Sequence, residues 1–222
     1  MRKVRHILKG YFITFEGAEG CGKSTQIRLL GEALEKAGRE VTVSRSPGGT
    51  VVAEKIRSIL KEVTPGEDLE PETELLLFGA CHSQMTANLI KPVLDKGGIL
   101  LSDRFYDSTI AYQGYARNLG VESVKWINHY ACRNLKPDLT ILLDMDPEEG
   151  IKRAAERAGT KENLANDRFD SEKLSFHHAV RNAFLRLAEE EPERFAVIAA
   201  NASIEEVHNR ILEAVHVHLG IL

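Results

Sequence analysis

The chain has 222 residues, of which 29 are Lys or Arg and 33 are Asp or Glu, so its formal net charge is −4. Hydrophobic residues make up 43% and charged residues 28%, which is typical of a globular protein and excludes a disordered chain. The acidic balance argues against a general binder of nucleic acids or membrane surfaces. We expect a single domain over residues 1–222, because a chain of this length can bury a large core.

Residues 1–9 contain the basic residues Arg2, Lys3, Arg5, His6 and Lys9. We expect this segment to form a solvated leader, and a small anion-binding arm is the alternative. They lack the apolar stretch of a secretory signal, and no segment has the roughly 18 consecutive apolar residues of a membrane span. The three cysteines are too few and too widely spaced for a zinc site or a disulfide framework. Together these features predict a cytoplasmic protein.

Short apolar runs alternate with stretches of helical periodicity along the chain. The predicted strands are Tyr11–Phe15, Val41–Val43, Ile99–Leu101, Leu139–Leu143 and Phe195–Ile198. The predicted helices run from Gly22 to about Lys36, from Val52 to Leu60, from about Pro71 to Lys96 and from about Ile204 to His218. Because parallel strands need long crossovers, this alternation predicts an α/β fold with a parallel five-stranded sheet and helices on both faces.

The first predicted strand leads into Gly17-Ala-Glu-Gly-Cys-Gly-Lys-Ser24, and a predicted helix follows. This is the G-x-x-x-x-G-K-[ST] pattern of a phosphate-binding loop in its proper context. In such a loop the backbone N–H groups and the helix N-terminus surround the phosphates. Lys23 would reach the β- and γ-phosphates, and the Ser24 hydroxyl would ligate Mg²⁺. The predicted ATP-binding residues are Gly17, Ala18, Glu19, Gly20, Cys21, Gly22, Lys23, Ser24 and Thr25.

Arginines follow two of the predicted strands. Arg45 and Arg104 stand where the second and third strands end. Because the carboxyl ends of parallel strands open into one crevice, the two arginines could converge on a second anion beside the triphosphate, although surface ion pairs are an alternative.

A polar segment from Ala158 to Asn166 separates two helical patterns and indicates either a surface loop or a mobile lid. Arg153 and Arg157 precede it at i and i+4 on one helix face. They would suit a lid that closes positive charge over a transferring phosphoryl group, and a solvated helix face is equally consistent with this spacing.

With these motifs in order, the sequence resembles the bacterial type of thymidylate kinase from about Gly10 to Leu212. The resemblance rests on Phe15–Gln26, Arg45-x-Pro-Gly-Gly-Thr50, Leu75–Phe78, Asp103–Gly114, Asp167–Phe169 and Glu191–Phe195. It implies a three-layer P-loop kinase fold with a lid at about residues 153–168, and transfer of the γ-phosphoryl group from ATP to dTMP. It also implies a homodimer.

The resemblance implies roles for individual residues as well. Arg45 and Arg104 would hold the 5′-phosphate of dTMP, and Asp103 would join this site and is a second possible ligand of Mg²⁺. Phe78 would stack on the thymine. The edge of the base or the sugar would meet Thr109 and Gln113, and the deoxyribose would pack on Tyr112.

The phosphate loop itself has the features of the bacterial type. Glu19 matches an acidic position that approaches the 3′-hydroxyl of the sugar. Gly20 stands where the bacterial type has no basic residue, and the lid residues Arg153 and Arg157 would supply the missing charge. The predicted catalytic residues are Lys23, Arg104, Arg153, Arg157 and Glu19.

Two residues depart from the family pattern. Ser46 replaces a Glu at a position that varies between branches. His82 stands where the family usually has an Arg that hydrogen-bonds the thymine O4. Because imidazole lacks the guanidinium fork, we expect weaker or broader base recognition, unless a nearby donor or a water takes over.

Two alternative functions remain open at this level. The departure at His82 leaves open a kinase for a related monophosphate such as dUMP. A nucleotide-binding module that has lost phosphoryl transfer is the second alternative. Retention of Lys23, Ser24, Arg45, Asp103 and Arg104 argues against it.

Overall fold

A computed structural model of the protein describes residues 9–158 and 172–222. Five parallel strands form one sheet in the order β2-β3-β1-β4-β5. The predicted parallel sheet and all five predicted strands are confirmed. The strands are β1 (Tyr11–Gly17), β2 (Val41–Arg45), β3 (Ile99–Asp103), β4 (Leu139–Asp144) and β5 (Phe195–Ala199).

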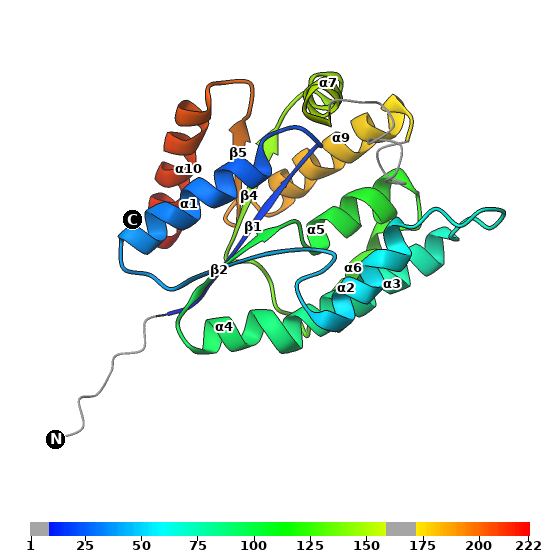
Figure 1. Cartoon of the computed structure of the whole chain (residues 1–222), viewed down its shortest axis with the longest axis horizontal. Helices are drawn as coiled ribbons and strands as arrows, with labels where there is room; N and C mark the ends of the chain where they lie inside the picture. Colours follow the sequence, from blue (N-terminus) through cyan, green and yellow to red (C-terminus); the bar gives the residue numbers. More distant parts are fainter. Residues whose placement is uncertain (1–8, 159–171) are drawn as a thin grey trace.

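Helices lie on both sides of this sheet (Figure 1). The segment predicted as helical from about Pro71 to Lys96 consists of α3 and α4 joined by the π-helical segment η1. A second π-helical segment, η2, continues α5. The helical elements are α1 (Lys23–Lys36), α2 (Val51–Lys61), α3 (Pro71–Met85), η1 (Thr86–Ile90), α4 (Lys91–Asp95), α5 (Tyr106–Thr109), η2 (Ile110–Ala116), α6 (Val121–Ala131), α7 (Pro147–Ala158), α9 (Leu174–Glu190) and α10 (Ile204–Leu219).

Alternate residues of β1 face two separate hydrophobic clusters. Phe12 belongs to a cluster formed with α3, α5, α6 and α9, whereas Ile13 and Phe15 belong to a cluster formed with α1 and α10. All three side chains are fully buried. A strand whose successive side chains point to opposite faces can be buried on both only when helices cover both faces, which gives the three predicted layers.

The sequence patterns did not predict the helices between Arg104 and Leu139, where α5, η2 and α6 lie. In η2, residues Ile110 to Gly114 are all buried, so no apolar stripe alternates with a polar face. In α6, Trp126 and Tyr130 are 68% and 78% exposed, so apolar residues occur on both faces of this helix.

Three sequence predictions fall wholly or partly outside the described residues. Of the basic leader, only Lys9 is described, and of the lid at about 153–168, only residues 153–158. The segment Asp167–Phe169 lies outside as well. In the part of the chain that the structure covers, no helix is long and apolar enough to span a bilayer.

A buried ion pair holds α5 against the sheet. The Arg194 Nη1 donates to Asp107 Oδ2 and to Thr140 Oγ1, both at 2.7 Å, and Nη2 donates to Asp107 Oδ1 at 3.0 Å. The side chains of Arg194 and Asp107 are 9% and 1% exposed. Because Asp107 is on α5 and Arg194 directly precedes β5, this pair fixes the helix that follows the end of β3.

We predict that Asp107→Asn lowers the free energy of unfolding by about 2–4 kcal/mol, because it leaves the Arg194 guanidinium buried without this countercharge. Urea unfolding measures the change. The matched control is Asp95→Asn, which breaks the exposed pair between Lys91 and Asp95 (3.1 Å) and should cost less than about 1 kcal/mol. Equal losses in the two variants would contradict a structural role for the buried pair.

Candidate active site

The phosphate loop between β1 and α1 packs directly on the start of α7. Gly20 has φ +73°, and a Cβ atom there would lie 2.0 Å from the carbonyl oxygen of Gly150. A Cβ atom on Gly150 would in turn lie 2.4 Å from the carbonyl oxygen of Glu19. Both positions therefore require glycine, and the helix that leads toward the predicted lid is in contact with the loop.

The lysine of the motif is held at the centre of the loop. The Lys23 Nζ donates to the carbonyl oxygens of Gly17 at 3.2 Å and Ala18 at 2.8 Å, and the residue is 6% exposed. Ser24, in the first turn of α1, is exposed. The loop thus presents an ammonium group and a hydroxyl group from adjacent residues.

The register of the sheet brings the second anion site to this loop. Phe15 of β1 pairs with Asp103 of β3, and Asp103 pairs with Arg45 of β2. Arg104 is the next residue, with φ +67°, and its N–H donates to the carbonyl oxygen of Phe15 at 2.9 Å. Two strand ends and the phosphate loop therefore meet at one edge, as the sequence predicted.

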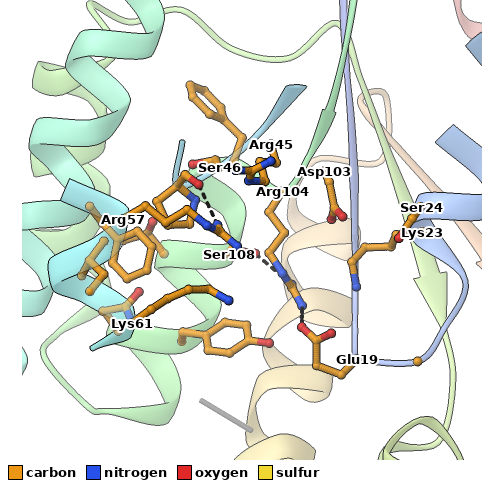
Figure 2. Close-up of a pocket in the computed structure, with 18 of the residues that line it drawn as sticks. Glu19, Lys23, Ser24, Arg45, Ser46, Arg57, Lys61, Asp103, Arg104 and Ser108 are labelled. Atoms are coloured by element: carbon orange, nitrogen blue, oxygen red, sulfur yellow. Dashed lines mark hydrogen bonds and ion pairs between the residues drawn. The ribbon is translucent and has the colours of Figure 1, made fainter. Parts of the chain in front are cut away.

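The Arg104 guanidinium reaches across to the phosphate loop (Figure 2). Its Nη2 donates to Glu19 Oε1 at 2.7 Å, and its Nη1 donates to Ser108 Oγ at 3.1 Å. The positive charge of Lys23 holds the pKa of Glu19 well below its usual range, burial opposes this effect, and Arg104 adds to it. Glu19 is therefore an anion placed between the two cations of the site.

Glu16 is a buried carboxyl group behind Arg104. It accepts hydrogen bonds from Phe105 N at 2.8 Å and from Ser108 Oγ at 2.6 Å, and it lies 3.8 Å from the Arg104 guanidinium. Burial raises the pKa of Glu16 to about 7, against the opposing charge of Arg104. Sequence reasoning missed this residue, because a Glu at the end of a strand carries no distinctive signal.

Arg45 points into the same region from the end of β2. Its Nη2 donates to both oxygens of Glu54 in α2, at 3.1 and 3.0 Å, and its side chain is 53% exposed. Glu54 also accepts from the N–H of Gly49 at 2.9 Å. This ion pair holds Arg45 beside the cavity while leaving much of the guanidinium accessible.

A cavity of about 300 Å³ joins these groups. The predicted residues that line it are Glu19, Gly20, Gly22, Lys23, Ser24, Arg45, Phe78, Asp103, Arg104, Thr109, Tyr112 and Gln113. The predicted residues Gly17, Ala18, Cys21, Thr25, His82 and Arg153 do not line it. The side chain of Arg157 lies outside the described residues.

Sequence reasoning also missed several lining residues, among them two cations of α2. Arg57 and Lys61 stand four residues apart and therefore share one helix face. The same i, i+4 spacing of two cations had led to the selection of Arg153 and Arg157. The Arg57 Nη1 donates to the carbonyl oxygen of Pro47 at 2.7 Å. The remaining missed residues are Ser46, Pro47, Leu60, Phe105 and Ser108.

The two departures from the family pattern contact each other. His82 is fully buried, and its Nε2 lies 3.1 Å from Ser46 Oγ. Burial lowers the pKa of His82 to about 4, with Asn128 opposing part of the shift, so the ring is neutral at pH 7. Ser46 lines the cavity and His82 does not, so His82 contacts a residue of the cavity wall rather than the cavity itself.

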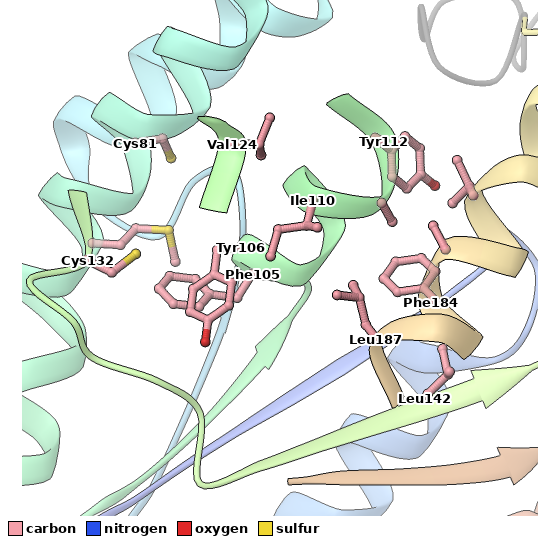
Figure 3. Packing of buried hydrophobic residues seen from close by; sticks show 14 of the residues in the cluster. Cys81, Phe105, Tyr106, Ile110, Tyr112, Val124, Cys132, Leu142, Phe184 and Leu187 are labelled. Atoms are coloured by element: carbon pink, nitrogen blue, oxygen red, sulfur yellow. The ribbon is translucent and has the colours of Figure 1, made fainter. Parts of the chain in front are cut away.

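The apolar side of the cavity is built from α3, α5 and η2. Phe78 and Tyr112 line it and are 9% and 8% exposed. Tyr112 packs edge-on against Phe184 of α9, and Phe105, which also lines the cavity, packs against Tyr106 (Figure 3). Closely packed aromatic groups behind the wall give the cavity a fixed shape.

The strand ends also meet the requirements of a magnesium site. Asp103 Oδ1 is buried and has no hydrogen-bond partner among the described residues, and Asp103 and Ser24 line the same cavity. No cluster of three or more His, Cys, Asp or Glu side chains suited to a metal occurs in residues 9–158 and 172–222. One carboxylate and one hydroxyl fit Mg²⁺, which is usually bound by few protein oxygens together with substrate phosphates.

Comparisons with known proteins agree with this geometry. The thymidylate kinase family matches residues 15–211. The thymidylate kinase of Pelobacter propionicus is 46% identical over 206 residues, which are 93% of this chain and 94% of that protein. The thymidylate kinase of Geobacter sulfurreducens is 47% identical over 196 residues, which are 88% of this chain and 92% of that protein.

A solved structure supports the same assignment. The crystal structure of thymidylate kinase from Ehrlichia chaffeensis superimposes with a TM-score of 0.74 at 30% identity, over 93% of this chain and 99% of the other. The predicted P-loop kinase fold is therefore confirmed, and the chain belongs to the thymidylate kinase family, the kinases that phosphorylate dTMP.

Proposed function

We propose how this chain performs the reaction of its family, the transfer of the γ-phosphoryl group of ATP to dTMP. The phosphate loop binds the triphosphate, and dTMP occupies the cavity with its 5′-phosphate between Arg45 and Arg104. The observation that supports this proposal is that Lys23 and Arg104 line one cavity, where the donor and acceptor phosphates would meet. Neither alternative, a dUMP kinase or an inactive module, has a comparable observation in its favour.

In this arrangement catalysis consists of alignment and charge neutralisation. Lys23 neutralises charge on the moving phosphoryl group, and Arg104 orients the attacking oxygen of dTMP. No general base is needed, because the acceptor is already an ionised phosphate. Glu19 holds the Arg104 guanidinium through the 2.7 Å ion pair and would approach the 3′-hydroxyl of the sugar.

We propose that Ser24 and Asp103 hold Mg²⁺ together with the phosphates of ATP. The ion would neutralise the developing negative charge on the β- and γ-phosphates. The unpartnered buried oxygen of Asp103 supports this role, because a buried carboxylate oxygen without a donor requires a cation or a water.

The base and sugar would occupy the apolar side of the cavity. Phe78 would stack on the thymine, Tyr112 would pack under the deoxyribose, and Thr109 and Gln113 would meet polar edges. His82 would act on the base through Ser46. Its effect on base selectivity stays a prediction.

The lid assignment is a proposal as well. Arg153 is held by Glu149 and by the carbonyl oxygen of Ala200 at 3.4 Å, on a helix that contacts the phosphate loop. We propose that Arg153 and Arg157 move with the segment at about 153–168 and bring positive charge to the γ-phosphate when ATP binds.

We further propose that residues 1–222 form one domain, that it pairs as a homodimer, and that it is located in the cytoplasm. The single domain is supported by the sheet, whose strands come from Tyr11 to Ala199.

The homodimer is supported by an exposed aromatic surface on α6. The rings of Trp126 and Tyr130 stack there with centroids 5.7 Å apart, and a second copy would cover them. The three cysteines are free and buried, which suits a reducing compartment.

We predict that Arg104→Met lowers kcat/KM for dTMP by at least about 100-fold, because the acceptor phosphate loses its charge-assisted hydrogen bonds. The KM for ATP should change little, since Lys23 and the loop remain. Steady-state kinetics measure both values. The control is Arg210→Met, which removes an arginine of α10 that donates to the carbonyl oxygen of Ala199. A normal kcat/KM for dTMP in Arg104→Met would contradict the proposed phosphate site.

We predict that Glu16→Gln changes the pH dependence of stability. Between pH 4.5 and about 7, Glu16 retains a proton in the folded chain that the unfolded chain has released. The free energy of unfolding should therefore fall as pH rises through this window, and the variant should lack this component. Relative to Glu16→Gln, the unmodified chain should lose about 1–3 kcal/mol between pH 4.5 and 8. Urea unfolding at several pH values tests this, and parallel profiles would contradict it.

A further inference from the structure

A fully buried carboxylate on α3 lies behind one of the residues that line the cavity. Glu74 Oε1 accepts a hydrogen bond from Gln113 Nε2 at 2.7 Å. The same oxygen accepts from Arg117 Nε at 2.8 Å, and Arg117 Nη1 donates to Glu172 at 2.8 Å. The carboxylate of Glu74 is thus fixed by a cation, which is in turn held by a second acid near the start of α9.

This contact determines which way round the Gln113 amide lies. A carboxylate can only accept hydrogen bonds, so Gln113 Nε2 must face Glu74. Gln113 Oε1 then points away from Glu74. Gln113 is 1% exposed and lines the cavity. Its Oε1 is buried and has no hydrogen-bond partner among the described residues. This residue of the cavity wall therefore has a buried acceptor without a partner among the described residues.

We propose that Glu74 is a positioning residue that sets base selectivity, by orienting Gln113 so that Oε1 accepts a hydrogen bond from N3–H of a 4-keto pyrimidine. This inference rests on the proposed location of Gln113 at the edge of the base. Thymine and uracil both carry a proton on N3. Cytosine has an unprotonated N3, so its lone pair would face the lone pair of Oε1, and both acceptors would be buried without a donor.

The orientation would be lost if residue 74 could also donate. In Glu74→Gln the new amide can turn its NH₂ group toward Gln113, at the cost of the hydrogen bond that Arg117 Nε donates to the same position. Gln113 can then turn its own NH₂ group toward the cavity and donate to N3 of cytosine. A purely structural role for Glu74 would instead affect all substrates alike. The ratio of kcat/KM values for different bases separates the two roles.

The experiment compares kcat/KM for dTMP, dUMP and dCMP in the unmodified chain and in Glu74→Gln. We expect the dTMP/dCMP ratio to fall at least about tenfold in the variant, the loss expected when one mismatched buried hydrogen bond is relieved. The dTMP/dUMP ratio should stay within about twofold, because the two bases share the N3–H donor. A dTMP/dCMP ratio that is unchanged, or a uniform fall for all three substrates, would overturn the proposal.

Two further variants complete the design. Glu74→Asp keeps a group that can only accept, so it should retain the dTMP/dCMP ratio, and a tenfold fall there would overturn the proposal even if Glu74→Gln does not fold. Gln113→Ala tests the underlying assignment. If it leaves kcat/KM for dTMP unchanged, the proposed location of Gln113 fails; if it lowers that value while Glu74→Gln keeps all ratios, only the role of Glu74 fails.

Discussion

The pairing of β3 with β1 in parallel register is the constraint on which the site depends. Because Phe15 lies opposite Asp103, the residue that follows β3 must emerge beside the phosphate loop that follows β1. Arg104 meets this requirement with a left-handed backbone and an ion pair to Glu19. A shift of one residue in this register would turn each side chain of the strand to the opposite face and remove both Asp103 and Arg104 from the cavity.

The electrostatics of the site follow from this convergence. Five cationic residues and only two acidic residues line the cavity, as binding of two anionic substrates requires. The cations are Lys23, Arg45, Arg57, Lys61 and Arg104, and the acids are Glu19 and Asp103. Glu19 stabilises the cations that lie nearest the loop, and Glu16 lies 3.8 Å from the Arg104 guanidinium. The pKa of Glu19 is lowered because this residue lies between two cations, whereas the pKa of Glu16 is raised because burial is the largest influence on it.

Sequence reasoning recovered the sheet and most of the cavity for identifiable reasons. Buried parallel strands are short apolar runs, and the phosphate loop has fixed spacing, so both are local signals. The helices between Tyr106 and Ala131 were not predicted, because η2 is buried nearly all round and α6 exposes aromatic residues. Helical periodicity is informative only when one face is polar.

Residues that act through other residues escaped prediction altogether. Glu16 and Glu74 were not singled out, because their importance depends on contacts with residues 39 or more positions away, such as Phe105 and Gln113. The contact between Ser46 and His82 shows the same limit, because the sequence marked both as departures from the family pattern but could not show that they are neighbours.

The claim that donor and acceptor phosphates share one cavity is tested most directly by measuring ADP release with ATP and Mg²⁺, with and without monophosphate acceptors. We predict that ADP forms rapidly only when an acceptor is present, and fastest with dTMP among dTMP, dUMP, dCMP, dGMP, AMP and UMP. Equal ADP release without any acceptor, or a clear preference for a monophosphate other than dTMP, would contradict this assignment.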